Sequence, residues 1–266
     1  MSFVEFNNVT FGYKEDDYLL LEDLSFSAEK NDIITVIGAS GCGKSTLFRL
    51  MTCLETEYKG SITINGKTPK EATGTAAFMP QKDLLMPWRN ILKNVTLPLE
   101  ALPMSKAERI SQAKEAIEKV GLSGCENKRP SELSGGMRQR VMIAMALCCN
   151  PKLIIADEPT TALDVTIQAQ IFDLLRDVKE KISGSIMLIT HDLGVIAEMV
   201  DYVVVMYAGR VVEKGTVTEI FKNPMHPYTI GLQKSKPVVG KEVDRLYSIP
   251  GNVPNPVNMP STCYFK

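Results

Sequence analysis

The chain has 266 residues and a formal net charge of -1, and 44% of its residues are apolar. This length suits one large domain, or one domain with a small appendage, and the apolar content is enough for a packed core. The near-neutral charge argues against a protein that holds nucleic acid or anionic lipid electrostatically. The longest apolar stretch, Val141 to Cys149, is about half of the length needed to cross a bilayer, and Met1 to Glu5 lack the features of a secretory signal. We therefore expect a protein of the cytosol.

The predicted elements, taken in chain order, alternate between short β-branched runs and helical patterns, which is typical of an α/β fold with a parallel sheet covered on both faces. Alternating apolar and polar residues predict an N-terminal antiparallel β subdomain, from the first 30 residues and from Ser61 to Asn65. Continuous apolar runs, typical of buried parallel strands, occur at 33–37, 153–156, 185–189 and 202–206. Helical patterns occur at 44–53, 106–120, 136–149 and 167–182.

Two stretches depart from this alternation. Between Met86 and Gly135 strand signals fade and helix-forming residues dominate, which predicts an inserted α-helical subdomain at about 86–135. After Lys234 the helical period is lost and prolines occur at 237, 250, 254, 256 and 260. We therefore expect a main domain over 1–234 and an irregular proline-rich extension over 235–266.

Six cysteines occur, and their positions are 42, 53, 125, 148, 149 and 263. Their spacing matches neither a zinc site nor a disulfide framework. Because free cysteine is among the most buried residue types, we expect buried, reduced thiols. Cys148 and Cys149 are adjacent on a predicted helix, so we expect their side chains to point to different faces.

A glycine-rich loop follows the strand at 33–37 and opens the helix at 44–53. It matches the pattern GxxxxGK[ST], and its residues are Gly38, Ala39, Ser40, Gly41, Cys42, Gly43, Lys44, Ser45 and Thr46. Glycines let backbone N–H groups turn inward around phosphates, and the helix N-terminus adds positive partial charge. We expect Lys44 to reach the β and γ phosphates of ATP and the Ser45 hydroxyl to ligate Mg²⁺. A chance glycine turn is the alternative, but the loop in this context predicts a P-loop NTPase, so the main domain would bind a nucleoside triphosphate, and the family resemblance described below implies a RecA-like parallel sheet core.

An acidic pair, Asp157 and Glu158, follows the apolar run at 153–156. A carboxylate at the end of a buried strand is costly unless it holds a cation, so Asp157 is placed to bind Mg²⁺. Glu158 can polarise the attacking water as the catalytic base. A solvated loop is the alternative for an isolated acidic pair, but a phosphate loop in the same chain disfavours it.

A third motif, Ser134-Gly135-Gly136, opens the helix at 136–149. Taken alone it would be a helix cap. A helix N-terminus also binds anions, and one domain does not need two sites for a γ phosphate. The motif therefore predicts a head-to-tail dimer, in which each copy contacts the ATP of the other.

With these three motifs the chain resembles the ABC transporter ATPases over essentially its whole length. The resemblance implies that Tyr13 stacks on adenine, although a packing aromatic is the alternative for this residue. It implies that Gln81 senses Mg²⁺ and couples to a permease, and that Asp164 lies in a loop that crosses the dimer interface. It also implies that His191 is the switch histidine that contacts the γ phosphate.

The resemblance further implies partners. These are integral membrane permease subunits, a second ATPase subunit that is identical or paralogous, and indirectly an extracytoplasmic solute-binding protein, with no nucleic acid. The protein would lie at the cytoplasmic face of the cell membrane. Two other classes are less favoured. Soluble ABC ATPases of DNA repair carry long insertions, whereas 52 positions separate Gln81 from Leu133, and a P-loop kinase or GTPase would leave Ser134-Gly135-Gly136 unexplained.

The resemblance is divided between two groups of importers. The loop at 38–46 and the segments at 84–88 and 94–99 are similar to nitrate, sulfonate and taurine importers. From Ser134 on, including 223–229, the chain is similar to oligopeptide, dipeptide and nickel importers, which we favour. Members of that group continue beyond this region with cysteines that can bind an iron–sulfur cluster. Here Thr262 to Phe265 contain one cysteine, too few for a cluster that needs about four, so we expect no metal centre.

Overall fold

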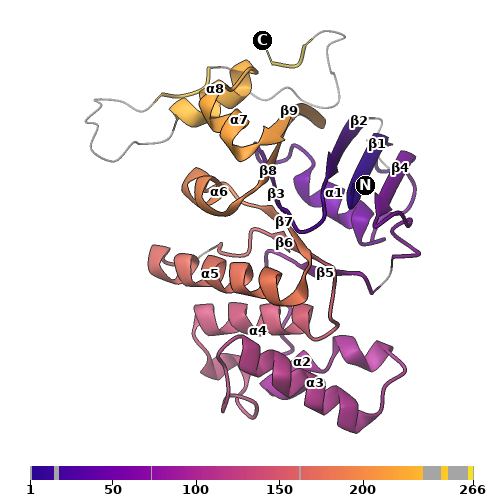
Figure 1. Ribbon diagram of the computed structural model, residues 1–266, viewed down its shortest axis with the longest axis vertical. Helices are drawn as coiled ribbons and strands as arrows, with labels where there is room; N and C mark the ends of the chain where they lie inside the picture. Colours follow the sequence, from indigo (N-terminus) through magenta and orange to yellow (C-terminus); the bar gives the residue numbers. More distant parts are fainter. Residues whose placement is uncertain are drawn as a thin grey trace. The chain divides into compact units, whose positions relative to one another are not determined.

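The computed structural model describes residues 2–14, 18–72, 74–161, 163–235, 247–250 and 263–265. It consists of two compact units. Figure 1 labels the helices and strands. The first unit combines Met1–Ala72 with Ile189–Lys266, and the second is Thr73–Leu188. Most of the extension expected over 235–266 lies outside the described residues, and its described parts, 247–250 and 263–265, form no helix or strand.

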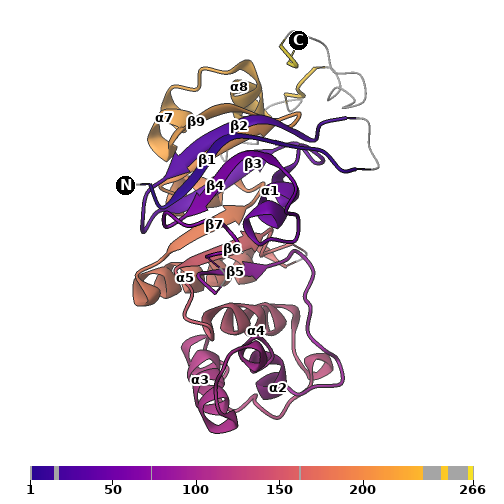
Figure 2. The ribbon, with the colours of Figure 1, turned by 90° about the vertical axis from the view of Figure 1, so that its right-hand side faces the viewer.

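The first unit contains a three-stranded antiparallel sheet, seen in Figure 2, which confirms the alternation predicted for this region. Its strands are β1 (Val4–Phe11), β2 (Leu21–Ala28) and β4 (Lys59–Ile64), and β1 lies in the centre. Phe6 and Phe26 are opposite each other on β1 and β2, and their rings stack with centroids 4.6 Å apart. Burial of this apolar face holds the sheet together.

The same unit contains a second set of strands, β3 (Ile33–Gly38), β8 (Tyr202–Tyr207) and β9 (Arg210–Thr216). β3 and β8 pair in parallel, and their nearly continuous burial confirms the prediction from apolar runs. β9 pairs antiparallel with β8 and was not predicted, because its half-exposed residues lack a strong pattern. The helices of this unit are α1 (Lys44–Met51), α6 (Leu193–Met199), α7 (Val217–Lys222) and α8 (Pro227–Lys234).

The second unit contains strands in the order β5 (Ala76–Met79), β6 (Leu153–Asp157) and β7 (Ser185–Ile189). Its helices are α2 (Ile91–Val95), α3 (Lys106–Lys119), α4 (Gly135–Leu147) and α5 (Val165–Ile182), with short 3-10 turns at Pro98–Ala101 and Pro130–Glu132. Buried Asn94 accepts a hydrogen bond from the Met86 N–H and donates to the carbonyl oxygens of Met86, Arg89 and Asn90. This network fixes the turn before α2.

The helix ends differ from the predicted ones by a few residues. α1 ends at Met51 because Cys53 adopts a left-handed φ of 57°, which a helix cannot contain. Cys148 is the C-cap of α4, and the sulfur atoms of Cys148 and Cys149 lie 4.0 Å apart. The expectation that these two side chains point to different faces is therefore wrong. All six cysteines are free thiols, but only Cys42, Cys125 and Cys148 are buried as expected, whereas Cys53 and Cys149 are half-buried and Cys263 is exposed.

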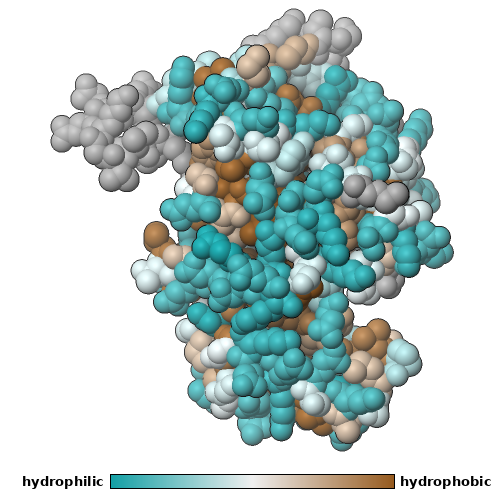
Figure 3. All heavy atoms as spheres, viewed as in Figure 1, coloured by the Kyte–Doolittle hydropathy of each residue, from teal (hydrophilic) through white to brown (hydrophobic). Residues whose placement is uncertain are grey.

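Hydrophilic side chains cover most of the face shown in Figure 3. Among the described residues, every helix is too short or too polar to cross a membrane.

Candidate functional site

The phosphate loop joins the end of β3 to the start of α1, and two of its glycines are sterically required. A Cβ atom on Gly38 would lie 2.2 Å from the carbonyl oxygen of Met206 on β8. Gly43 has a φ of 98°, and a Cβ atom there would lie 2.5 Å from Cδ2 of Leu21. These close approaches explain why the loop needs glycine at both ends.

Lys44 lies over the loop from the first turn of α1. Its Nζ atom donates hydrogen bonds to the carbonyl oxygens of Gly38 and Ala39, each at 2.8 Å. Ser45 is exposed beside it, and no acidic residue lies in this first turn. An ammonium group and an uncompensated helix N-terminus together favour a bound anion. Burial raises the pKa of the Cys42 thiol, so this loop cysteine stays protonated.

The acidic pair lies at the end of β6 in the second unit. Asp157 is the last residue of the strand and is buried. Glu158 follows it with a left-handed φ of 46°, a conformation that costs a non-glycine residue about 1–3 kcal/mol and is common at functional sites. Gln81 Nε2 donates to Glu158 Oε2 at 2.8 Å, and Thr161 Oγ1 donates to the same oxygen at 2.9 Å. Gln81 and Glu158 were predicted from the sequence as site residues, whereas Thr161 was not, because its position three residues after Glu158 is the only local sign of its role.

The Ser134-Gly135-Gly136 motif forms the start of α4. The Ser134 hydroxyl accepts a hydrogen bond from the Met137 N–H at 3.3 Å. The helix cap that was the alternative interpretation of this motif is therefore present. A Cβ atom on Gly136 would lie 2.6 Å from Cγ2 of Ile167 on α5. Asp164 caps α5 in turn, accepting from the Ile167 N–H at 2.9 Å. Both Ser134 and Asp164 are exposed, so they remain accessible to a partner.

We expect Gly136→Ala to destabilise the fold by about 1–3 kcal/mol, the usual cost of an added methyl group in a packed contact. The reason is the 2.6 Å approach to Ile167, which a methyl group cannot occupy unless α4 and α5 separate. Urea unfolding measures the change in the free energy of unfolding. The matched control is the same substitution in an Ile167→Ala background, where the clashing Cγ2 atom is gone and the cost should be smaller. An equal cost in both backgrounds would contradict this explanation.

Two further predicted residues lie in the first unit. Tyr13 is half-buried, and its ring packs edge-to-face on Phe11 with centroids 4.9 Å apart. It lines a cavity of about 570 Å³ that Leu54 also lines. His191 is exposed in the turn before α6. Tyr13 therefore packs against Phe11, as the alternative interpretation expects. The exposed part of its side chain remains accessible to a second ring.

The structure distributes the predicted residues between the units. The first unit holds Tyr13, the loop at 38–46 and His191, and the second unit holds Gln81, Ser134, Gly135, Gly136, Asp157, Glu158 and Asp164. The structure therefore brings Gln81 together with Glu158, and Gly136 together with the segment that Asp164 caps.

The predicted magnesium ligands have suitable chemistry. Ser45, Gln81 and Asp157 offer a hydroxyl, an amide and a carboxylate oxygen, which are the hard oxygen donors that Mg²⁺ prefers. The Gln81 amide nitrogen is already used as the donor to Glu158, so its oxygen is the atom left for a cation. The residues present therefore fit the ion.

Two family models match the sequence. Residues 21–161 match the model described as ABC transporter, and residues 212–266 match the model described as Oligopeptide/dipeptide transporter, C-terminal region. The oligopeptide transport ATP-binding protein AppD of Bacillus subtilis is 42% identical, over 98% of this chain and 87% of that protein. The dipeptide transport ATP-binding protein DppD of Lactococcus lactis is 42% identical, over 95% of this chain and 78% of that protein.

Two solved structures are also similar. A dimeric ATP-binding cassette in a post-hydrolysis state, bound to ADP and phosphate, has a TM-score of 0.70 and 31% identity, and the match covers 80% of this chain and 98% of that one. The protein cbiO1 of Clostridium perfringens, part of an ABC transporter complex, has a TM-score of 0.76 over 84% of this chain and 91% of that one. Its identity is 23%, so this second likeness concerns the fold alone.

Proposed function

Because the chain belongs to the ABC transporter family, we propose that it hydrolyses ATP to power the uptake of oligopeptides or dipeptides through a separate membrane permease. Three relatives that match almost the whole chain are named as oligopeptide or dipeptide transport ATP-binding proteins. Their similarity spans 95% to 98% of this chain, so it includes the segments at 84–88 and 94–99 that resemble nitrate importers. This full-length similarity favours peptides over nitrate, sulfonate or taurine. The predicted P-loop NTPase fold class is confirmed by both solved structures.

The positions of the predicted site residues support ATP hydrolysis. The observation that carries it is the arrangement of Glu158, whose carboxylate is held by Gln81 and Thr161 in a strained turn after a buried strand. A carboxylate fixed in this way polarises a water molecule towards the γ phosphate. Lys44 and the loop N–H groups bind the β and γ phosphates, and His191 contacts the γ phosphate. No protein side chain forms a covalent bond to the phosphate in this reaction. The protein therefore contributes positioning and electrostatic stabilisation.

Ser45, Gln81 and Asp157 would hold Mg²⁺, which neutralises charge on the phosphates when it is bound. Tyr13 stacks on adenine beside Phe11. These roles are carried over from the family resemblance to individual residues. The exposed position of Ser45 and the burial of Asp157 support them.

The second unit carries the surface that we assign to the permease. Leu84 and Trp88 are large apolar residues with 58% and 71% of their surface exposed. Trp88 also lines a cavity of about 640 Å³ together with Arg89, Lys93 and Arg109, so apolar and basic groups meet there. A permease segment that docks on this surface would place the protein at the cytoplasmic face of the membrane. The extracytoplasmic solute-binding protein acts indirectly through the permease, and nucleic acid has no part in the function.

The test is co-purification with one peptide-type permease pair and one nitrate-type or sulfonate-type pair, followed by ATPase assays with the substrate and its binding protein. We expect stimulation with the peptide-type pair alone. Trp88→Ala should lower the yield of the complex and the stimulation, because the exposed indole is removed from the docking surface, and it should retain basal hydrolysis. Leu102→Ala is the matched control, since Leu102 is a 39% exposed apolar residue of the same unit that does not line the cavity. Stimulation only by the nitrate-type pair would overturn the peptide assignment.

A further inference from the structure

One ion pair joins the loop after Gln81 to the start of α4, and both segments belong to the second unit. Arg138 Nε donates to Oδ2 of Asp83 at 3.1 Å, although 55 positions separate the two residues along the chain. Another nitrogen of the same guanidinium, Nη1, donates to the carbonyl oxygen of Leu133 at 3.0 Å. Arg138 therefore connects the carboxylate of one loop to the peptide that directly precedes Ser134.

The residue whose carbonyl Arg138 holds is fixed at its other end as well. Leu133 is 5% exposed, and its N–H donates to the carbonyl oxygen of Pro130 in the preceding 3-10 turn at 3.2 Å. The side chain of Leu133 is thus buried, and its N–H and carbonyl groups are both hydrogen-bonded. These contacts set the direction in which the chain reaches Ser134, the N-cap of α4.

The guanidinium also lies close to the helix start that we expect to meet a phosphate. A Cβ atom on Gly135 would lie 4.0 Å from Nη2 of Arg138, and the first turn of α4 contains no acidic residue. A cation near a helix N-terminus opposes the helix dipole, which is unfavourable unless negative charge is nearby. Asp83 supplies negative charge of this kind from the neighbouring loop.

Asp83 is held in turn, because its loop is anchored on both sides of it. Two residues earlier, Gln81 Nε2 donates to the carboxylate of Glu158 at 2.8 Å. Three residues later, the N–H of Met86 donates to Oδ1 of buried Asn94 at 2.7 Å. The carboxylate therefore belongs to an ordered loop, which reduces the conformational entropy lost in forming the ion pair.

We propose that Arg138 is a positioning residue for the ATP site of a partner copy. Held by Asp83, its guanidinium fixes the Leu133 carbonyl and thereby the orientation of the Ser134-Gly135-Gly136 motif, which would face the γ phosphate bound by the partner. The proposal rests on the proposed ATP hydrolysis in a head-to-tail dimer, and it does not depend on which solute is transported.

The first test compares single variants. We expect Arg138→Ala to lower kcat by about 5- to 10-fold, the low end for a lost hydrogen bond of a charged group, because the side chain is partly exposed. Asp83→Ala should lower kcat less, since the bond from Arg138 to Leu133 remains. Binding of a fluorescent ATP analogue should equal that of the wild type, because Lys44 and its loop are unchanged. A residue that only stabilised the fold would lower the thermal unfolding midpoint without this selective loss of turnover.

The double variant tests whether the two residues act as one unit. Arg138→Ala combined with Asp83→Ala should lose no more activity than Arg138→Ala alone, because the carboxylate acts only through the guanidinium. Losses that multiply in the double variant would show that Asp83 acts by another route. Glu115→Ala is the matched control, since it breaks a partly exposed ion pair with Lys119, 2.7 Å long, on α3 of the same unit, and its kinetics should equal those of the wild type.

Mixing with Lys44→Ala decides which ATP site Arg138 serves. In a dimer of Arg138→Ala with Lys44→Ala, one composite site joins an intact phosphate loop to an intact Ser134 motif, so the mixture should exceed the mean rate of the two unmixed variants. If Arg138 acted instead on Glu158 of its own chain, that site would also be impaired and the mixture would show only the mean. Should Arg138→Ala not fold, Asp83→Ala takes its place. The mean rate alone, or a wild-type kcat in Arg138→Ala, would overturn the proposal, whereas a wild-type protein without ATP hydrolysis would overturn the proposed function.

Discussion

Glu158→Gln is expected to lower ATP turnover by about 10²- to 10⁴-fold, the usual contribution of a general base. The amide has nearly the same shape as the carboxylate but cannot polarise a water molecule by accepting its proton. ATP affinity should stay near the wild-type value, because Lys44 and the loop that bind the phosphates are unchanged. Since bound ATP is no longer cleaved, the variant should accumulate as an ATP-bound dimer, which size-exclusion chromatography with MgATP would detect.

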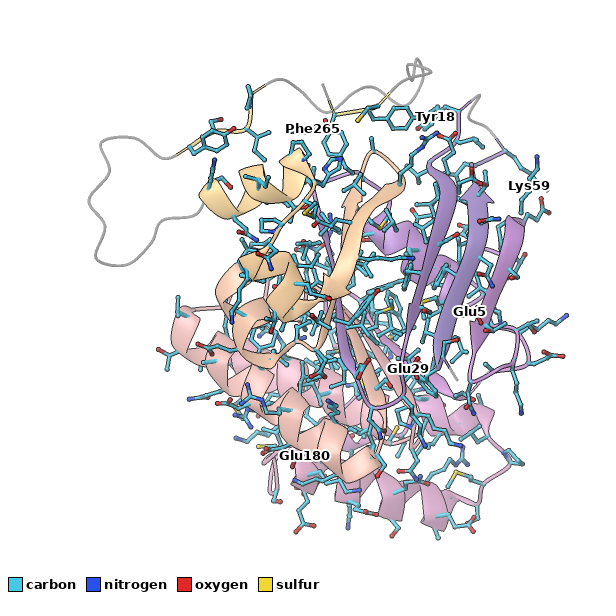
Figure 4. The ribbon with its side chains drawn as sticks, turned by 45° about the horizontal axis from the view of Figure 1, so that its top comes forward. Glu5, Tyr18, Glu29, Lys59, Glu180 and Phe265 are labelled. Carbon is cyan, nitrogen blue, oxygen red and sulfur yellow. The ribbon has the colours of Figure 1, made fainter. Side chains whose placement is uncertain are left out.

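The control for this experiment is Glu180→Gln, which removes the same charge from an exposed position on α5, labelled in Figure 4. Its turnover should equal that of the wild type. Turnover near the wild-type rate in Glu158→Gln would show that another group activates the water. If this variant instead lost ATP binding, Glu158 would have a structural role. Its hydrogen bonds with Gln81 and Thr161 would then maintain the nucleotide-binding site rather than orient a catalytic base.

Lys44→Ala and Ser134→Arg, each purified alone, are expected to lose almost all ATPase activity, and an equal mixture should recover part of it. The first variant loses the cation that binds the phosphates. The second places a bulky side chain where α4 would meet the γ phosphate of a partner. In a head-to-tail dimer that contains one chain of each kind, one composite site has both Lys44 and Ser134 intact while the other has neither, so hydrolysis returns only after mixing.

The measurement is the ATPase rate as a function of the mixing ratio. Ser105→Arg is the matched control, because Ser105 caps α3 in the same way and its loss costs about 1 kcal/mol of helix stability without affecting the dimer. The Ser105→Arg variant should hydrolyse ATP when it is purified alone, without being mixed with a second variant. If Ser134→Arg alone hydrolysed ATP at the wild-type rate and stayed monomeric with ATP, the shared-site model would fail.

The sequence by itself determined the type of most elements and predicted the chemistry of the site. The loop at 38–46, the Asp157–Glu158 pair and the Ser134-Gly135-Gly136 motif are local patterns, and each lies at a strand end or helix start that apolar periodicity already indicates. Periodicity depends only on which residues a helix or strand can bury, so it can be read without a structure. The strands at 33–37 and 185–189 are examples, since the structure reproduces them within one residue.

Only the tertiary structure decided which distant groups meet. No local pattern relates Ile34 to its partner Tyr202, or Gln81 to Glu158. β9 was missed for the same reason, because its half-exposed residues become a strand by pairing with β8 rather than by their own preference. Such contacts depend on how buried surfaces fit together after the chain has folded. The residues predicted to perform the chemistry can therefore be proposed from the sequence, whereas those that hold them in position emerge only from the packing.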